Sequence, residues 1–325
     1  MKKIPIIICI DVEPDARDVD RATAKDWNGF EETVSFFSEI RPRLEDATGA
    51  PVRYSWFFRM DPQVEHSYGA AGWVATRYRE AIEKLESAGD ELGLHAHAWR
   101  WDYGLHQWIV DHGDQQWINH CLNSSFEAYR SAFGRLCRCF RFGDHWMNNE
   151  TMGLLESLGV KFDLTVEPGI KAKPALVLEE AHTGALPDYT VTPKWPYRPS
   201  RRDFRKQSLL QSRGLWVVPL STGRNGMGRF ASLKRAALAL GMDFHRQYET
   251  TPLYLVLDGP AFQAMANNLL GAWRKRYLAP VVRTDAGVNS IYNANMAKNV
   301  EFLLSHPLID RFEFVTPDRA VKLLS

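Results

Sequence analysis

The chain has 325 residues, a net charge of +1 and four cysteines, and 45% of its residues are hydrophobic. This composition is ordinary for a soluble globular enzyme or binding protein. The near-zero charge argues against a protein whose main partner is nucleic acid or an anionic membrane, and four cysteines are too few for a disulfide scaffold.

The first ten residues resemble a secretory signal, but Pro5 interrupts the short apolar run and Asp11 ends it without a small-residue cleavage site. No other apolar stretch approaches the roughly 20 residues that a membrane-spanning helix needs. We therefore expect a cytoplasmic protein with reduced thiols and no transmembrane segment. No pattern in the sequence specifies an oligomeric state.

Short β-rich runs, most of them ending in a charged or polar residue, recur along the chain. They are residues 4–10, 52–58, 92–98, 137–142, 160–166, 215–220, 253–257 and 312–315. Several are followed by stretches with apolar residues at helical spacing and a glycine where a helix would end. These predicted helices are residues 76–88, 119–133, 150–158 and 233–240.

Strands that alternate with helices imply a parallel α/β sheet. About eight such units, with nearly all informative residues at the carboxyl ends of the strands, favour a closed or nearly closed barrel. The alternative is an open doubly wound sheet, which usually carries a glycine-rich first turn. Here the first turn, residues 11–15, is Asp-Val-Glu-Pro-Asp, which is acidic and would repel phosphate. The barrel is therefore the favoured fold.

Residues 182–212 interrupt this alternation with a segment rich in proline, arginine and aromatic residues. A long irregular insertion in a compact domain is commonly a functional loop, and the aromatic residues indicate a packed one. We interpret residues 1–325 as a single barrel domain that carries this insertion. The basic part of the insertion, residues 198–206, either is solvated or contacts a diphosphate.

Two carboxylates follow the first predicted strand. Alternate residues of a strand share a face, so Asp11 and Glu13 can point into one cleft. One carboxylate could bind a divalent metal while the other takes a proton from water. The alternative is that both residues only cap a loop and are solvated.

A pair of histidines closes the third predicted strand. His95 and His97 also share a strand face, so their imidazoles can converge on one ion. A His-x-His that ends an apolar strand is more specific than a lone histidine, and a pair of packed histidines is the structural alternative.

Charged residues end two further strands. Arg141 could hold a nearby carboxylate ionised and oriented, and His145 could donate a proton or contact substrate. Arg59 and Asp61 could contact substrate, Asp61 could be a further ligand, or the two residues could simply pair with each other. Taken alone, each of these residues fits a structural role at least as well.

In this order the four constellations resemble the NodB-type polysaccharide deacetylases, the carbohydrate esterase 4 superfamily. The resemblance is most specific at residues 10–13 (Ile-Asp-Val-Glu), 90–95 (Asp-Glu-Leu-Gly-Leu-His) and 140–143 (Phe-Arg-Phe-Gly), and in layout it covers most of the chain. Further similar segments are residues 148–152, 154–166 and 302–317. Within the superfamily the chain resembles the divergent, WbmS-like members found with surface-polysaccharide biosynthesis genes.

The resemblance implies a distorted (β/α)7 barrel that uses one divalent metal ion, usually Zn²⁺, to hydrolyse an N- or O-acetyl group from a sugar. It implies that Asp11 is the general base and that Arg141 orients it. It also implies that Glu13 and His95 are metal ligands.

The chain departs from the family pattern twice. The second metal histidine of the family lies four residues after the first, where this chain has Trp99, so His97 would have to replace it. The family's late histidine, its general acid, should close residues 253–257, but Asp258 follows there. Asp258 would need burial to stay protonated; otherwise His145 donates the proton, or activity is lost.

The substrate we expect is an acetylated sugar on a nucleotide-linked or lipid-linked precursor of a surface polysaccharide. Aromatic rings can stack on sugars, although packing at the barrel edge is the alternative for each tryptophan. The residues expected to contact the sugar are Arg59, Asp61, Trp99, Trp146 and Trp195, with Trp101 as a further candidate for stacking.

The main rival is a catalytically inactive barrel that binds glycan or scaffolds a biosynthetic complex, and the two departures favour it. A metal hydrolase of the amidohydrolase or PHP type ranks third. Those enzymes place a His-x-His after the first strand and need further ligand histidines downstream, whereas here the motif falls on the third strand.

Overall fold

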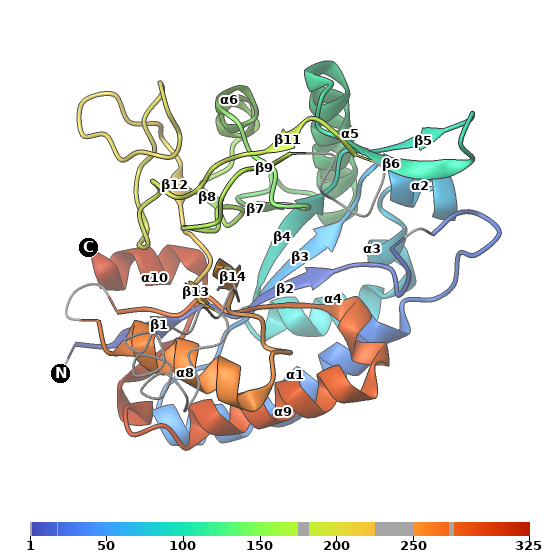
Figure 1. Cartoon of the computed structure of the whole chain (residues 1–325). Helices are drawn as coiled ribbons and strands as arrows, with labels where there is room; N and C mark the ends of the chain where they lie inside the picture. The colour runs from blue at the N-terminus through green and yellow to red at the C-terminus, as the bar shows by residue number, and fades with distance from the viewer. Residues whose placement is uncertain (1, 18, 175–181, 225–249, 273–275) are drawn as a thin grey trace, which may run out of the picture.

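The computed structural model describes residues 2–17, 19–174, 182–224, 250–272 and 276–325. Their centre is a seven-stranded parallel sheet that curls into a half-barrel (Figure 1). In spatial order its strands are β12 (Trp216–Val217), β8 (Phe162–Asp163), β7 (Cys139–Phe142), β4 (Glu91–Ala96), β3 (Ser55–Arg59), β2 (Cys9–Val12) and β15 (Val281–Arg283). The predicted α/β class and distorted barrel are confirmed.

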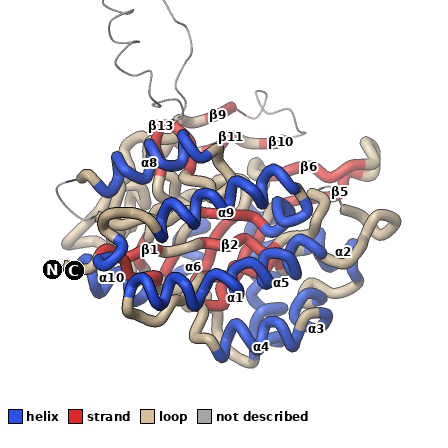
Figure 2. Tube along the Cα trace, turned by 90° about the horizontal axis from the view of Figure 1, so that it is seen from below, coloured by secondary structure: helices blue, strands red, loops and turns tan. Residues whose placement is uncertain are grey.

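Helices surround this sheet, and Figure 2 shows α1 and α9 running side by side beneath β2. The described helices are α1 (Asn28–Thr48), α2 (Pro62–Tyr68), α3 (Trp73–Arg77), α4 (Arg79–Ser87), α5 (Gln115–Phe133), α6 (Asn149–Ser157), α8 (Gly259–Leu270), α9 (Ser290–Leu304) and α10 (Pro317–Leu324). Two 3₁₀ turns, η2 (Thr284–Val288) and η3 (Ile309–Arg311), accompany them. None of these helices combines the length and the apolar character that a bilayer span requires.

The helix boundaries follow local capping chemistry. Asp114 precedes α5 and accepts hydrogen bonds from the first backbone N–H groups of that helix, while Gly134 ends it at a φ of 65°. The predicted helix 119–133 lies within α5, and 150–158 matches α6 to within one residue. The predicted helix 76–88 is instead the pair α3 and α4, which break at Tyr78. The predicted helix 233–240 lies outside the described residues.

The strands differ from the predicted runs at the two ends of the chain. Residues 4–10 form two strands, because β1 (Ile4–Ile6) leaves the main sheet to pair with β16 (Phe312–Phe314). The seventh strand is β15, which has only three residues and was not predicted. Residues 253–257 were predicted as a barrel strand but make only an isolated bridge to β15 through Tyr254. Just before them, β14 (Thr250–Pro252) pairs with β13 (Thr222–Arg224).

A hairpin and the insertion stand beside the half-barrel. The hairpin consists of β5 (Trp99–Asp102) and β6 (Gln107–Asp111), and β10 (His182–Thr183) joins β6 in parallel. Nearby, β9 (Lys173–Pro174) pairs with β11 (Ala185–Leu186).

The insertion packs as expected from its aromatic residues. Tyr189, Tyr197 and Phe204 are buried in the main hydrophobic core. Some of its basic residues are paired, since Arg201 contacts Glu156, and Arg205 and Lys206 share Asp203. The insertion therefore packs as an integral part of the fold.

A buried aspartate ties helix α1 to the strands. The side chain of Asp90 is fully buried and accepts hydrogen bonds from the Arg41 guanidinium at 2.7 and 3.0 Å. It also accepts from the backbone N–H of Tyr54 and the indole N–H of Trp56, both at 2.9 Å. Four donors thus depend on one carboxylate.

We expect Asp90→Ala to lower the free energy of unfolding by about 3 to 5 kcal/mol, because it leaves a buried charge and two buried N–H groups without acceptors. Urea denaturation measures this loss. The control is Asp46→Ala on the exposed side of α1, which should change the free energy of unfolding by about 0.5 kcal/mol or less. Equal effects of the two substitutions would contradict the role of Asp90.

Candidate metal and acid–base site

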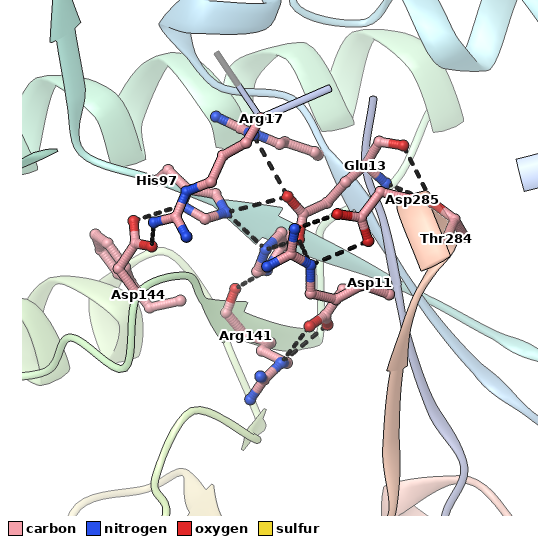
Figure 3. A network of polar contacts seen from close by, with 12 residues as sticks. Asp11, Glu13, Arg17, His97, Arg141, Asp144, Thr284 and Asp285 are labelled. Carbon is pink, nitrogen blue, oxygen red and sulfur yellow. Dashed lines mark hydrogen bonds and ion pairs between the residues drawn. The ribbon is translucent and has the colours of Figure 1, made fainter. Parts of the chain in front are cut away.

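The candidate site lies where several parallel strands end. In the register of the sheet, Arg59 of β3 pairs with His95 of β4, and His95 pairs with Arg141 of β7. At the edge of the sheet formed by β2 and β15, Asp11 of β2 pairs with Arg283 of β15. Paired residues of neighbouring parallel strands point to the same face, so the fold gathers these side chains at one place. Figure 3 shows Asp11 and Arg141 of this group beside Glu13 and His97.

Glu13, His95 and His97 form a compact buried cluster of possible metal ligands. The Nε2 atoms of His95 and His97 are 2.9 Å apart. They lie 3.5 and 3.7 Å from the two carboxylate oxygens of Glu13. The sequence predicted these three residues as ligands, and the structure brings them together.

The proton positions of the two imidazoles follow from their neighbours. The Nδ1 atom of His95 is 2.9 Å from the backbone oxygen of Arg141, and that of His97 is 2.7 Å from Oδ2 of Asp144. Both oxygens only accept, so each Nδ1 carries a proton, and each ring presents a lone pair on Nε2 when it is neutral. Two lone pairs that face each other repel, and a cation bound between them and Glu13 relieves the repulsion.

The charges around the cluster also fit a cation. Six carboxylates and four guanidiniums lie in or beside the cluster, so the carboxylates outnumber the guanidiniums by two. The members are Asp11, Glu13, Asp61, Asp144, Glu167, Asp285, Arg17, Arg59, Arg141 and Arg283. A bound cation would offset this excess, as would a proton on a histidine of the site such as His145.

Glu13 itself is ionised. Burial opposes its charge, but Arg283 and the two histidines outweigh burial and hold the pKa of Glu13 well below its ordinary value. Arg59 and Arg283 each lie 3.5 Å from its carboxylate. The same carboxylate is thus available to a cation and shared with two guanidiniums.

Asp11 lies beside this cluster and is held by Arg141. The Nε atom of Arg141 is 2.9 Å from both carboxylate oxygens of Asp11. A further N–H of the guanidinium donates to the backbone oxygen of Leu164 at 3.0 Å. Two separate contacts therefore fix the orientation of the guanidinium. The contact between Asp11 and Arg141 is the one that the family resemblance implied.

A strained turn follows β7 and carries two ionisable residues. Asp144 and His145 have φ angles of 51° and 58°, a left-handed conformation that costs a non-glycine residue about 1 to 3 kcal/mol. Nδ1 of His145 is 2.6 Å from Oε2 of the buried Glu167. Burial lowers the pKa of His145, but Glu167 outweighs it and the pKa is raised above its ordinary value. His145 is 34% exposed and can reach a ligand.

Other predicted residues lie elsewhere. Asp258 is exposed and caps α8, where its side chain accepts from the backbone N–H of Ala261 at 3.0 Å. The burial that would keep Asp258 protonated is not found. Arg59 and Asp61 are fully buried and pair at 2.7 Å, so the ion-pair alternative holds and neither is exposed to a substrate.

The tryptophans expected to contact the sugar also differ in how exposed they are. Trp99 is only 2% exposed, and its indole N–H donates to Asp144 at 2.7 Å. Trp146 is also buried and stacks on His112 with ring centroids 4.7 Å apart. Trp101 is half-buried and stacks on His66, while Trp195 is 39% exposed.

Three residues of the site escaped the sequence interpretation. Asp144 stands inside the motif that supplied Arg141 and His145, but no role was given to it. Glu167 comes directly after a predicted strand, a position that could have marked it. Arg283 ends the unpredicted strand β15, so its place depended on an element that the pattern did not show.

Comparisons with known proteins give likeness in fold only. No family model matches the chain, and no curated protein matches it in sequence. Among solved structures, a protein from Parabacteroides distasonis described as a glycoside hydrolase/deacetylase is 11% identical, with a TM-score of 0.57 over 99% of this chain and 71% of that one. A GH57-type branching enzyme from Pyrococcus horikoshii is 11% identical, with a TM-score of 0.50 over 99% and 70%.

A third structure, from Mycobacterium smegmatis and described as a polysaccharide deacetylase, is 13% identical and has a TM-score of 0.48 over 100% of this chain and 91% of that one. At these identities the likeness establishes architecture alone. The chain shares its distorted barrel with the first two of these structures, and it has a buried Glu/His/His cluster that could hold a metal ion.

Proposed function

We propose that this protein is a metal-dependent deacetylase that hydrolyses an acetyl group on a sugar. The observation that carries the proposal is the Glu13, His95 and His97 cluster, in which two imidazole lone pairs converge beside a buried carboxylate. Asp11, held by Arg141, adds a base within the same network. The fold neighbour described as a glycoside hydrolase/deacetylase supports a carbohydrate substrate.

Glu13, His95 and His97 would hold the metal ion, which we propose to be Zn²⁺ because a mixed carboxylate and imidazole set suits it. When bound, such an ion supplies Lewis acidity to the acetyl carbonyl and acidifies water. Asp11 accepts the proton of the attacking water, and Arg141 holds its carboxylate in a fixed orientation.

His145 donates the proton that the departing sugar nitrogen or oxygen requires. Its proton remains in place at higher pH because Glu167 raises the pKa of His145. Asp258, the other candidate for this role, is exposed and engaged as a helix cap. The assignment therefore favours His145 as the general acid.

The substrate we propose is an acetylated sugar on a nucleotide-linked or lipid-linked surface-polysaccharide precursor in the cytoplasm. A groove of about 370 Å³ begins at Trp146, next to His145 in the chain, and reaches Arg202 and Arg205 of the insertion. A sugar at His145 could extend along this groove and place a phosphate near those arginines. Trp195 is the exposed tryptophan among the proposed sugar contacts.

The rival function is a glycan-binding barrel without catalysis. The observation that favours it is the approach of Arg59 and Arg283 to within 3.5 Å of Glu13, since guanidiniums compete with a cation for the carboxylate. A measurement of metal binding distinguishes the two functions, because only the deacetylase requires a bound metal ion.

Protein stripped of metal with a chelator should bind one Zn²⁺ per chain in calorimetric titration. His95→Ala and Glu13→Ala should each weaken binding by about 100-fold or more, because each removes one of three ligands. The control is His120→Ala, an exposed histidine whose loss should leave affinity unchanged. A wild-type protein that binds no Zn²⁺ would contradict the proposed function and favour the inactive rival.

Asp11→Asn should slow acetate release from an acetylated nucleotide sugar by about 100-fold or more, since it removes the base. The variant should still fold, because Arg141 keeps the Leu164 carbonyl and Glu167 as partners; thermal melting checks this. Asp258→Asn is the matched control and should keep the wild-type rate. A full rate in Asp11→Asn would mean that another group is the base.

Glu167→Gln should shift the alkaline limb of the pH–rate profile to lower pH by about one to two units, the usual effect of one adjacent charge. The reason is that a general acid works only while protonated, and the pKa of His145 falls when Glu167 loses its charge. The profile of kcat/KM measures the shift. The exposed Glu150, changed to Gln, is the control. If the limb stays in place in Glu167→Gln, His145 is not the acid.

A further inference from the structure

We propose that Asp144 is the residue that makes His97 a metal ligand, and that Trp99 serves this pair instead of the substrate. The inference rests on the proposed metal site and goes further, because it assigns a positioning role to a residue outside the ligand set. It also explains how His97, two positions after His95, can replace the family's second metal histidine. In the family that histidine lies four positions after the first, where this chain has Trp99.

His97 lies just beyond β4, so strand pairing does not orient its ring. His95 is inside β4 and finds its acceptor on the neighbouring strand, the backbone oxygen of Arg141 at 2.9 Å. The acceptor for His97 is a side chain instead, Oδ2 of Asp144 at 2.7 Å. This carboxylate keeps the proton on Nδ1 of His97 and so leaves the lone pair on Nε2.

The Asp144 carboxylate is itself held on both oxygens. Oδ2 also accepts the indole N–H of Trp99 at 2.7 Å, and Oδ1 pairs with Arg17 at 2.5 Å. The guanidinium of Arg17 also lies over the Trp99 ring, 4.9 Å from its centroid. The tryptophan that stands at the family's histidine position thus fixes the carboxylate that fixes His97.

The backbone is shaped around the same contact. Gly143 packs against the His97 ring so closely that a methyl group at its Cα would overlap the imidazole. The N–H of Gly143 donates to the backbone oxygen of Ala96 at 2.8 Å, which anchors the turn to β4. The left-handed conformation of Asp144 then directs its side chain to His97 (Figure 3). A strained turn that persists at such a point indicates function.

The test compares Asp144→Asn with wild-type protein by two measurements. Calorimetric titration with Zn²⁺ alone should show affinity about 10- to 100-fold weaker in the variant, the usual effect of losing a carboxylate behind a ligand histidine. Nitrogen-15 NMR of the metal-free proteins should show His97 protonated on Nδ1 in the wild type and a mixture of tautomers in the variant. Trp99→Phe should weaken affinity by a smaller factor, because Asp144 keeps its charge.

The control is Asp111→Asn, which removes another buried carboxylate near this end of the fold. Asp111 pairs with Arg100 and Thr183 and contacts neither histidine, so affinity should stay unchanged. If Asp144→Asn binds Zn²⁺ with the same affinity as the wild type, the role of Asp144 is overturned and the proposed function remains intact. A wild type that binds no Zn²⁺ would overturn both. If Asp144→Asn fails to fold, Nε2 protonation of His97 in the metal-free wild type would overturn the inference.

Discussion

Ionised groups are buried in a protein only when they are paired, and this requirement shapes the carboxyl-terminal end of the half-barrel. Arg59, Arg141, Glu13 and Asp11 are almost wholly buried, and each has an oppositely charged neighbour. Glu13 follows β2 and meets Arg59 of the adjacent strand β3, whereas Asp11 of β2 meets Arg141 of β7 across the curved sheet, with β3 and β4 between their strands. Asp11 and Glu13 therefore have charged partners in a position where water would otherwise be needed to solvate them.

Within this network the closest polar contact between two ligand atoms is that of His95 and His97, at 2.9 Å. Two neutral imidazoles would repel in this arrangement. In the metal-free protein a proton on His95 can relieve the repulsion, since Asp11 and Glu13 outweigh burial and raise the pKa of His95. The cluster thus favours positive charge. The proposed divalent metal ion would supply that charge in place of the proton. The strained turn at Asp144 keeps this geometry in place.

The family resemblance and the tertiary structure agree on the parts of the site that lie on long, apolar strands. Asp11, His95 and Arg141 end β-rich runs whose pattern is visible in the sequence, and the structure brings them together. Residues on short or irregular elements were misjudged. Asp258 proved to be an exposed helix cap, because a run that looks like a strand forms only an isolated bridge. Trp99 proved to be buried against Asp144.

The sequence by itself determined the α/β class, the strand ends that carry the site, and the identity of the three candidate ligands. Hydrophobic period and strand-end residues are local signals, so they can be read without a structure. Only the tertiary structure decided that Asp144 faces His97 and that Glu167 faces His145, contacts that span 47 and 22 positions along the chain. Such pairs depend on strand order and on a left-handed turn, and neither leaves a periodic pattern in the sequence.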